Sequence, residues 1–243
     1  MKKKVKIIIS VTVLLALIIA AKLILFSSKF YYVGTIEATK VDISARVGSI
    51  INTIDALEGG AVKKGQVLMT LGCEDIKISA NQILRDYERA QKLFNQGSIP
   101  LENYEHAKNK ADDVKLRIEW CSIVSPINGT VLTQYREAGE LVQPGTKLFT
   151  VADLDHLWTY VYVAEPMLSK IKLNDNVKGY LSELGMKAFK GTITKISDEA
   201  EFTPKNVQTK NERTRLVFGV KVSFDREGEI LKPGMSIEVE FLE

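Results

Sequence analysis

The sequence repeats one short pattern, and a long helical segment separates the two copies. Residues 41–72 and residues 121–152 both contain short β-branched runs between glycine turns. The runs predict strands and the glycines predict turns. From the first to the last glycine the spacing is 17 residues in one copy and 16 in the other. Such a repeat is the half-unit of a flattened barrel with two-fold pseudosymmetry, so we expect the copies to pair. The corresponding glycines are Gly48, Gly59 and Gly65 in the first copy and Gly129, Gly139 and Gly145 in the second.

Residues 74–119 separate the copies and carry a heptad pattern. Apolar or small residues recur at alternating spacings of four and three, which is typical of a coiled-coil seam. The sequence NQGSIP (95–100) interrupts the pattern, and its Gly97 and Pro100 both break helices. We therefore predict an αα-hairpin of two antiparallel helices, each of about 20 residues and roughly 30 Å. The seam positions are Ile76, Ala80, Ile83, Tyr87, Ala90 and Phe94, then Tyr104, Ala107, Ala111, Val114 and Ile118.

The repeated pattern is similar to the biotinyl/lipoyl half-motif, occurring twice. In carrier proteins of that fold, the two halves join through a tight turn that bears a modified lysine. Here the hairpin takes the place of that turn, and Lys77 near the junction lies on a predicted helix. A carrier function is therefore disfavoured. The interpretation is a lipoyl-like domain formed by residues 41–73 and 120–153, which the hairpin splits.

The N-terminus has the composition of a membrane anchor. Four lysines precede an apolar run that Lys22 interrupts. The run has about 20 residues, enough to span a bilayer of roughly 30 Å, and the lysines are expected to stay cytoplasmic. We predict an anchor at residues 1–29, a linker or membrane-proximal strand at residues 30–40, and an exported body. A cleaved signal peptide ending at Ala21 is the alternative, although Ile19 stands where a small residue is preferred.

The third region, residues 154–243, alternates apolar and polar residues in several short runs. Such alternation predicts strands, and several short strands with turn signals predict a small antiparallel β-barrel. A short helix is expected at residues 165–171. The predicted strands are 157–165, 176–181, 188–197, 214–224 and 235–243.

The distribution of charge argues against a nucleic-acid-binding protein. The 33 basic residues include six lysines in residues 1–30, a stretch without acids, so residues 31–243 hold 27 basic and 30 acidic side chains. This balance gives no basic footprint. The sequence also lacks a nucleophile-elbow motif and a phosphate-binding loop. We therefore expect neither a cofactor nor catalysis.

The two histidines do not form a convincing metal site. His106 lies on the polar side of the second predicted helix and is expected to be solvated. His156 lies beside Asp153 and Asp155. A metal site requires more ligands in the correct geometry, and a turn before a strand explains these residues equally well.

The order of the segments resembles the haemolysin-D-like periplasmic adaptors, also called membrane fusion proteins. SPINGTV (125–131), EAGELVQPGTKL (137–148) and LWTYVYVAE (157–165) match the usual pattern of that family. AEFTPKNVQTKNERTRLVFGVKV (200–222) is similar to the branch that serves ABC-type exporters. The resemblance implies a mainly β, non-enzymatic adaptor of an efflux or secretion system, held in the inner membrane by one helix with its body in the periplasm. It also implies a homo-oligomer, a hexamer in the family, that links an inner-membrane transporter, ABC-type rather than proton-driven, to a TolC-type outer-membrane channel.

The hairpin tip is the candidate partner-binding site. RAQKLFNQGSIP (89–100) resembles the tip motif by which family members meet TolC-type channels. Arg89 and Leu93 match that motif, whereas Pro100 stands where serine is expected and Ser98 lies close by. A generic helix turn with a solvated arginine is the alternative interpretation.

The two cysteines flank the hairpin. Cys73 stands at its entrance and Cys121 at its exit, and both would lie in an oxidising compartment after export. If the halves pair as predicted, these residues lie on adjacent strands, where a disulfide is feasible. Two buried thiols are the alternative.

Two other classes of protein remain open at the level of sequence. One is a membrane-tethered, extracytoplasmic module that binds a ligand or metal. The other is the carrier subunit of an enzyme, which predicts a cytoplasmic location and a modified lysine. The predicted anchor disfavours the second class.

Overall fold

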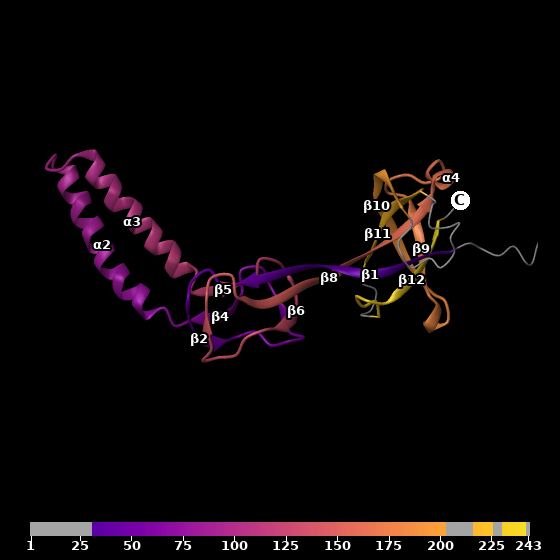
Figure 1. Cartoon of the computed structure of the whole chain (residues 1–243), viewed down its shortest axis with the longest axis horizontal. Coiled ribbons are helices and arrows are strands. Elements are labelled where there is room, and N and C mark those ends of the chain that lie inside the picture. Colours follow the sequence, from indigo (N-terminus) through magenta and orange to yellow (C-terminus); the bar gives the residue numbers. More distant parts are fainter. Residues whose placement is uncertain (1–30, 203–215, 226–229, 242–243) are drawn as a thin grey trace, which may run out of the picture. The chain divides into compact units, whose positions relative to one another are not determined.

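The protein is described from a computed structural model of the full chain, which describes residues 31–202, 216–225 and 230–241 (Figure 1). The predicted anchor at residues 1–29 and most of the 200–222 segment lie outside these ranges. Among the described residues, no helix is both long enough and apolar enough to cross a bilayer.

The fold is mainly β with one helical hairpin, as the sequence predicts. Short strands precede and follow the hairpin, and longer strands form the C-terminal part. The elements are β1 (Tyr32–Ser44), β2 (Ser49–Ile54), β3 (Ala61–Val62), β4 (Val67–Leu71), α2 (Glu74–Asn95), α3 (Leu101–Glu119), β5 (Ser122–Val124), β6 (Gly129–Gln134), β7 (Leu141–Val142), β8 (Lys147–Ala164), α4 (Glu165–Leu168), β9 (Asn176–Leu181), the 3-10 helix η1 (Ser182–Leu184), β10 (Lys187–Phe202), β11 (Leu216–Asp225) and β12 (Ser236–Phe241).

The chain divides into two compact units. The barrel unit contains residues up to Thr35, Thr159–Val222 and residues from Ser236 onward. The split-domain unit contains Ile36–Trp158 and Ser223–Met235. In the barrel, strands form a closed ring in the order β1-β12-β9-β10-β11-β8, because β8 also pairs with β1. The predicted β-barrel is therefore confirmed.

Of the two alternatives for residues 30–40, a linker or a membrane-proximal strand, the structure shows a strand from Tyr32 onward, which continues to Ser44. β1 begins at Tyr32, and its first residues pair with β12, from Tyr32 opposite Val239 to Thr35 opposite Ser236. β1 closes the barrel, because without it the edges of β12 and β8 would have no neighbouring strand. β8 also begins earlier than predicted and runs without interruption across the expected boundary at residue 154. Both strands thus contribute residues to both units.

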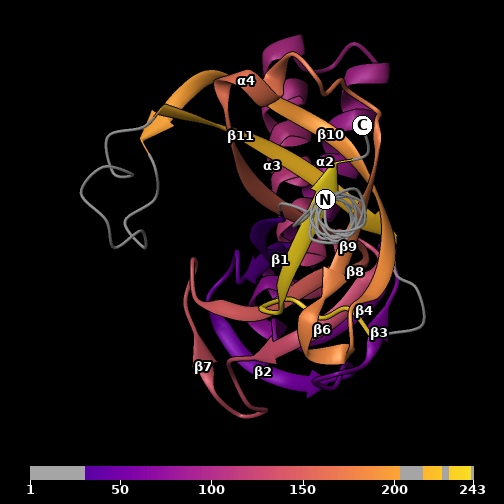
Figure 2. The same cartoon turned by 90° about the vertical axis from the view of Figure 1, so that its right-hand side faces the viewer.

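The two lipoyl-like halves follow a two-fold pseudosymmetry with a constant offset of 80 residues, as from Ala45 to Ser125. The Ala45 N–H donates to the Thr146 carbonyl at 2.9 Å, and the Ser125 N–H donates to the Gln66 carbonyl at 2.9 Å. The antiparallel pairs β2–β7 and β6–β3 are equivalent in the same way. Figure 2 shows β2 and β7 side by side. The paired halves thus build one domain from two copies of one pattern.

The glycine-based alignment of the halves is wrong by one residue at its start. Ser49 pairs with Val142 as Gly129 pairs with Val62. Ser49, and not Gly48, is therefore the equivalent of Gly129. The difference between spacings of 17 and 16 residues arises from this slip, because the later glycines keep the offset of 80 residues.

The core of the split domain contains residues from both halves and from the hairpin. Strand residues of the two halves point inward and are almost completely buried, as in Ile51, Leu68 and Val131. The helical residues Ile76, Ala80 and Val114 belong to the same cluster. The first turns of the hairpin are therefore part of this core.

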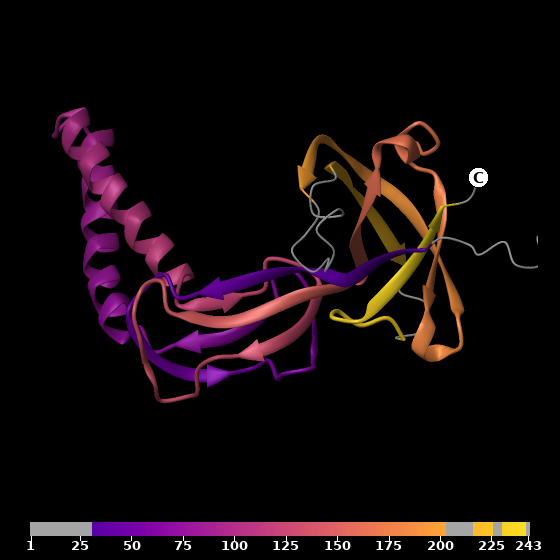
Figure 3. The same cartoon turned by 45° about the vertical axis from the view of Figure 1, so that its right-hand side comes forward.

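Helices α2 and α3 run side by side and antiparallel beyond that core (Figure 3). The predicted seam is confirmed by burial: Ile76, Ala80, Ala111 and Val114 are buried, and the remaining seam residues are half-buried. The apolar seam explains why the helices pair, since each would otherwise expose an apolar stripe to water.

Candidate functional site: the hairpin and its root

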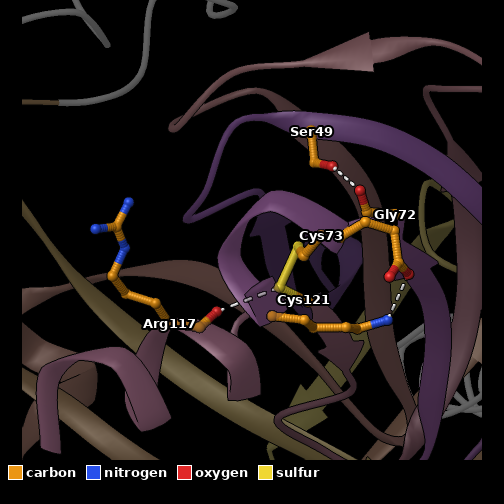
Figure 4. The surroundings of a disulfide bond; sticks show 7 residues. Ser49, Gly72, Cys73, Arg117 and Cys121 are labelled. Carbon is orange, nitrogen blue, oxygen red and sulfur yellow. Dashed lines mark hydrogen bonds and ion pairs between the residues drawn. A yellow bond between two sulfur atoms is a disulfide. The ribbon is translucent and has the colours of Figure 1, made fainter. Parts of the chain in front are cut away.

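Cys73 and Cys121 form a disulfide at the root of the hairpin (Figure 4). Their Cα atoms lie 6.1 Å apart, and 48 sequence positions separate them. Both side chains are buried, with exposed fractions of 0% and 5%. The bridge thus joins the N-terminal end of α2 to the chain that leaves α3.

The backbone around the disulfide is hydrogen-bonded to both halves of the split domain. The Leu71 N–H donates to the Cys121 carbonyl at 2.8 Å, which continues the β4–β5 pairing beneath the bridge. The Gly72 N–H donates to the Ile50 carbonyl at 2.8 Å, and the Ser49 hydroxyl donates to the Gly72 carbonyl at 2.8 Å. The root is therefore fixed to β2 as well as to β5.

Two further contacts concern neighbouring helix residues, and Figure 4 labels the first of them. The Cys121 sulfur lies 3.3 Å from the Arg117 carbonyl oxygen; because a bridged sulfur carries no proton, we regard this as a contact and not as a hydrogen bond. Lys77 forms an ion pair with Glu74 at 2.8 Å, on the first turns of α2. Lys77 therefore lies on a helix, and not on a tight turn of the kind that presents the modified lysine in carrier proteins.

A Schellman motif ends α2 at the hairpin tip. Gly97 has φ of 69°, the left-handed conformation that glycine adopts most readily. The Gly97 N–H donates to the Phe94 carbonyl at 2.9 Å, and the Ser98 N–H donates to the Leu93 carbonyl at 2.8 Å. These are the two bonds of the motif. Pro100 then precedes α3 in an extended conformation.

The four predicted tip residues lie in different environments. Arg89 is exposed, and its guanidinium lies 3.4 Å from the Asp86 carboxylate. Leu93 is half-buried, four residues further along the same face of α2. Ser98 and Pro100 are exposed in the turn and just before α3. The geometry thus presents Ser98 and Pro100 to solvent, while Arg89 lies about two turns below them.

An aromatic cluster near the tip was not predicted as a unit. The rings of Phe94 and Tyr104 stack with their centroids 4.9 Å apart, and the centroids of the Tyr87 and Tyr104 rings lie 6.0 Å apart. A hydrogen bond with Tyr104 raises the pKa of Tyr87. The cluster joins α2 to α3 across the seam. All three residues are seam positions, so the aromatic character of adjacent heptad positions was the available signal.

Leu101 is a second feature that the sequence interpretation missed. It follows Pro100 at the start of α3, and 53% of its surface is exposed. An exposed leucine next to the turn adds apolar surface at the end of the hairpin.

The histidines do not form a metal site in the described part of the chain. There, no group of three or more His, Cys, Asp or Glu side chains could hold a metal ion. His156 Nδ1 lies 2.8 Å from the Asp153 carboxylate, and this hydrogen bond raises the pKa of His156. The same carboxylate accepts backbone N–H groups of Asp155 and His156. These residues lie within β8, so the predicted turn before a strand is wrong. His106 is exposed on α3.

A polar network on the outer face of the split domain was also not predicted. Asp42 of β1 accepts a hydrogen bond from Thr150 at 2.6 Å and pairs with Lys147 at 2.8 Å. These two hydrogen bonds lower the pKa of Asp42. Lys147 also lies over the ring of Tyr135 at 4.6 Å. The network joins β1 to β8, and no local motif identifies it because its members are far apart in sequence.

A groove of about 580 Å³ lies beside the hairpin root. Its walls are residues of β1 and β5 together with the end of α3, including Ile43, Ile123, Leu116 and Trp120. Arg46 lies over the Trp120 ring at 5.9 Å. Ile43 and Ile123 are equivalents under the pseudosymmetry, so the groove lies between two equivalent edges of the domain.

Comparison with known proteins agrees with this architecture. Residues 39–153 match the model of the CzcB-like barrel-sandwich hybrid domain. A UPF0194 membrane protein of Enterobacter is 27% identical over 73% of this chain, which spans 56% of that relative's length. The UPF0194 membrane protein YbhG of Salmonella paratyphi B is 24% identical over 86% of this chain and 87% of its own.

Solved structures show the same fold over most of the chain. A MacA–MexA chimeric protein with the Pseudomonas aeruginosa MexA α-hairpin domain has a TM-score of 0.69 at 19% identity, covering 88% of this chain and 82% of that one. The membrane fusion protein Spr0693 of Streptococcus pneumoniae has a TM-score of 0.68 at 16% identity, covering 88% of this chain and 99% of that one. The chain therefore contains a CzcB-like barrel-sandwich hybrid domain at residues 39–153 and has the fold of the MacA–MexA chimera and of the membrane fusion protein Spr0693.

Proposed function

We propose that this protein is the non-enzymatic adaptor of a multi-component efflux or secretion system. The observation that carries the proposal is the helical hairpin inserted into the split barrel-sandwich domain, with its root in that domain's core. A hairpin held in this way has a defined free end at residues 96–100. The arms of 22 and 19 residues give it a reach of about 30 Å.

The membrane partner of this adaptor is an ABC-type transporter of the inner membrane. The apolar run within residues 1–29 would hold the chain beside it, with the body in the periplasm. The ABC-type assignment rests on the sequence of residues 200–222, which is similar to the corresponding branch of the family. The transporter would supply all ATP hydrolysis.

Several copies would pack through the split domain into a ring, a hexamer as in the family. The outer face of the sheet β5-β4-β2-β7 suits such packing because its cross-strand pairs carry no charge. Val67 pairs with Val124, and Ile50 pairs with Leu141; all four have exposed fractions between 38% and 67%. Between these pairs, the hydroxyls of Thr53 and Thr70 bond each other at 2.7 Å. Exposed uncharged faces of this kind are typical of interfaces.

The hairpin tip would dock the outer-membrane channel of TolC type. Ser98, Pro100 and the exposed Leu101 supply the contact surface at the turn, and Arg89 and Leu93 lie along one face below it. The tip lacks serine at position 100, so contact through Ser98 replaces that interaction.

Site-specific crosslinking in cells tests the proposal. A photoreactive residue at position 93 or 101 should capture an outer-membrane channel, identified by mass spectrometry. The same residue at position 110, exposed in the middle of α3, is the matched control and should capture less channel. Capture of a different partner at positions 93 and 101, without any channel, would overturn the tip assignment. A purified protein that hydrolyses ATP or carries an acylated lysine would overturn the adaptor function itself.

A further inference from the structure

The hairpin meets the split domain at two chain segments, one before α2 and one after α3. In an unsplit domain of this kind a tight turn would join β4 directly to β5. Here 49 residues from Gly72 to Trp120 take the place of that turn. The disulfide between Cys73 and Cys121 restores a short covalent connection between the same two strands.

The root of the hairpin packs into the core of the split domain, whereas the rest of its two helices pack against each other. Ile76, Ala80 and Val114 belong to the core of the split domain and are at most 8% exposed. Ala111 is also buried, whereas the seam residues nearer the tip are only half-buried. The helices therefore depend on the root for their attachment to the split domain, while residues nearer the tip, such as Phe94 and Tyr104, pack across the seam.

The disulfide lies inside this packed root and not on the surface. Cys73 is 0% exposed and Cys121 is 5% exposed. The Leu71–Cys121 backbone hydrogen bond and the Ser49–Gly72 hydrogen bond surround it. A reductant or a disulfide exchange partner can reach the sulfur atoms only after the root opens.

We propose that the Cys73–Cys121 bridge is a conformational clamp, which makes the hairpin and the split domain move as one body. The clamp closes during folding, when the docked root brings the two thiols together. A disulfide donor of the exported compartment, such as oxidised glutathione, accepts the two electrons. One cysteine thiolate attacks the donor and releases one thiol, and the second cysteine then resolves the mixed disulfide and releases the other.

The open form would differ from the closed form in a specific way. Without the bridge, both chain segments at the root keep their packing but lose the covalent limit on their separation. Local opening of the first turn of α2 and the last turn of α3 then becomes more frequent, whereas the barrel, whose strands form their own hydrogen-bonded ring, keeps its stability. This property belongs to the isolated chain and does not depend on the proposed partners.

Hydrogen exchange on the full chain in detergent tests the clamp. Oxidised wild-type protein is compared with the same protein after reduction, so that the sequence and the core volume are unchanged. We expect amide exchange in residues 74–83 and 111–121 to accelerate by about tenfold or more on reduction, with exchange in β9, β10 and β12 unchanged. Without denaturant, reduction should be slow and limited by opening of the root.

Two variants complete the test. Cys73→Ala with Cys121→Ala should match the reduced wild type, and Leu93→Ala, an oxidised variant altered near the tip, should match the oxidised wild type at the root. Equal root exchange in the oxidised and reduced proteins would overturn the clamp, as would two free thiols in protein isolated from the exported compartment. Because no transporter or channel is present in this experiment, its failure leaves the adaptor proposal standing, and failure of the crosslinking leaves the clamp standing.

Discussion

Single residues determine how closely the strands within each half of the split domain can pack. Gly129 lies where β6 crosses close to β8, and a Cβ atom there would collide with the Ala152 carbonyl oxygen. Its pseudosymmetric equivalent is Ser49, which has a side chain and donates it to the Gly72 carbonyl. The two halves thus have the same backbone fold, but their strands pack at different distances at this position. A sequence alignment based on glycines alone cannot distinguish these cases.

Gly129→Ala should destabilise the split domain by about 1–3 kcal/mol, because the added methyl group forces the backbone of β6 away from β8. Gly72→Ala is the control, since its Cβ would have only an ordinary contact of 3.6 Å with the Ile50 carbonyl oxygen. Urea unfolding of the two variants measures the difference. Equal stability of the two would show that β6 and β8 can separate without cost.

The Asp42 network makes a prediction about pH. Hydrogen bonds from Lys147 and Thr150 hold the folded-state pKa of Asp42 below its ordinary value of 3.8. A lowered pKa means that the ionised carboxylate stabilises the fold above pH 3.8, and that this contribution disappears as the pH falls through the lower, folded-state pKa. Asp42→Asn should therefore be less stable than wild type at pH 7.

Urea unfolding gives the difference in the free energy of unfolding between Asp42→Asn and wild type, and this difference should decrease progressively below pH 4. Glu37→Gln replaces another exposed acid on β1 and serves as the control. A difference for Asp42→Asn that stays constant down to pH 2 would exclude the ionised carboxylate as its source.

At the scale of elements, the hairpin follows most closely from the sequence. Its helices, its seam and its break are all local patterns: α2 ends just before Gly97, and α3 begins directly after Pro100. β1 was harder to predict, because its neighbours β12 and β8 are distant in sequence. The alternation of buried and exposed residues along β1 indicates a strand, but it does not indicate which strands β1 pairs with. The polar network of Asp42, Lys147 and Thr150 was missed for the same reason.

Gly97→Ala should loosen the tip without affecting the root. Alanine in the left-handed conformation costs about 1–2 kcal/mol, and this cost acts on the last turn of α2, where the Schellman bonds are made. Hydrogen exchange should accelerate in residues 91–98 and stay unchanged in residues 74–83. Ser98→Ala is the control, because Ser98 contributes its backbone N–H and not its side chain to the motif. Exchange that accelerates equally in both variants would contradict the cap assignment.

At the scale of the whole molecule, the fold class was predictable because each segment has its own periodicity. The repeat, the heptads and the alternating runs indicate the split domain, the hairpin and the barrel in turn. The boundaries between segments were not predictable to the same degree, because β1 and β8 continue through them. The candidate partner residues at the tip remain predictions, since a partner surface depends on a second protein.

Excision of the hairpin should leave a folded but less stable split domain. Because Leu71 and Cys121 lie opposite each other on antiparallel strands, an Asn-Gly turn can replace residues 72–120, with Cys121→Ala to remove the free thiol. The loss of Ile76, Ala80 and Val114 from the core should lower the melting temperature of this domain but not of the barrel. Calorimetry and circular dichroism measure both transitions. An unfolded split domain would show that its halves need the hairpin in order to pair.

The pseudosymmetry of the split domain has a mechanical consequence. Under the offset of 80 residues, β4 and β5 are the equivalents of β8 and β1. The first pair continues into the two helices, and the second pair continues into two strands of the barrel. A single chain connection acts as a swivel, whereas two parallel connections resist twisting. The exit toward the hairpin, where β4 and β5 are hydrogen-bonded and the disulfide joins the two chain segments, therefore resists twisting of the helices against the split domain.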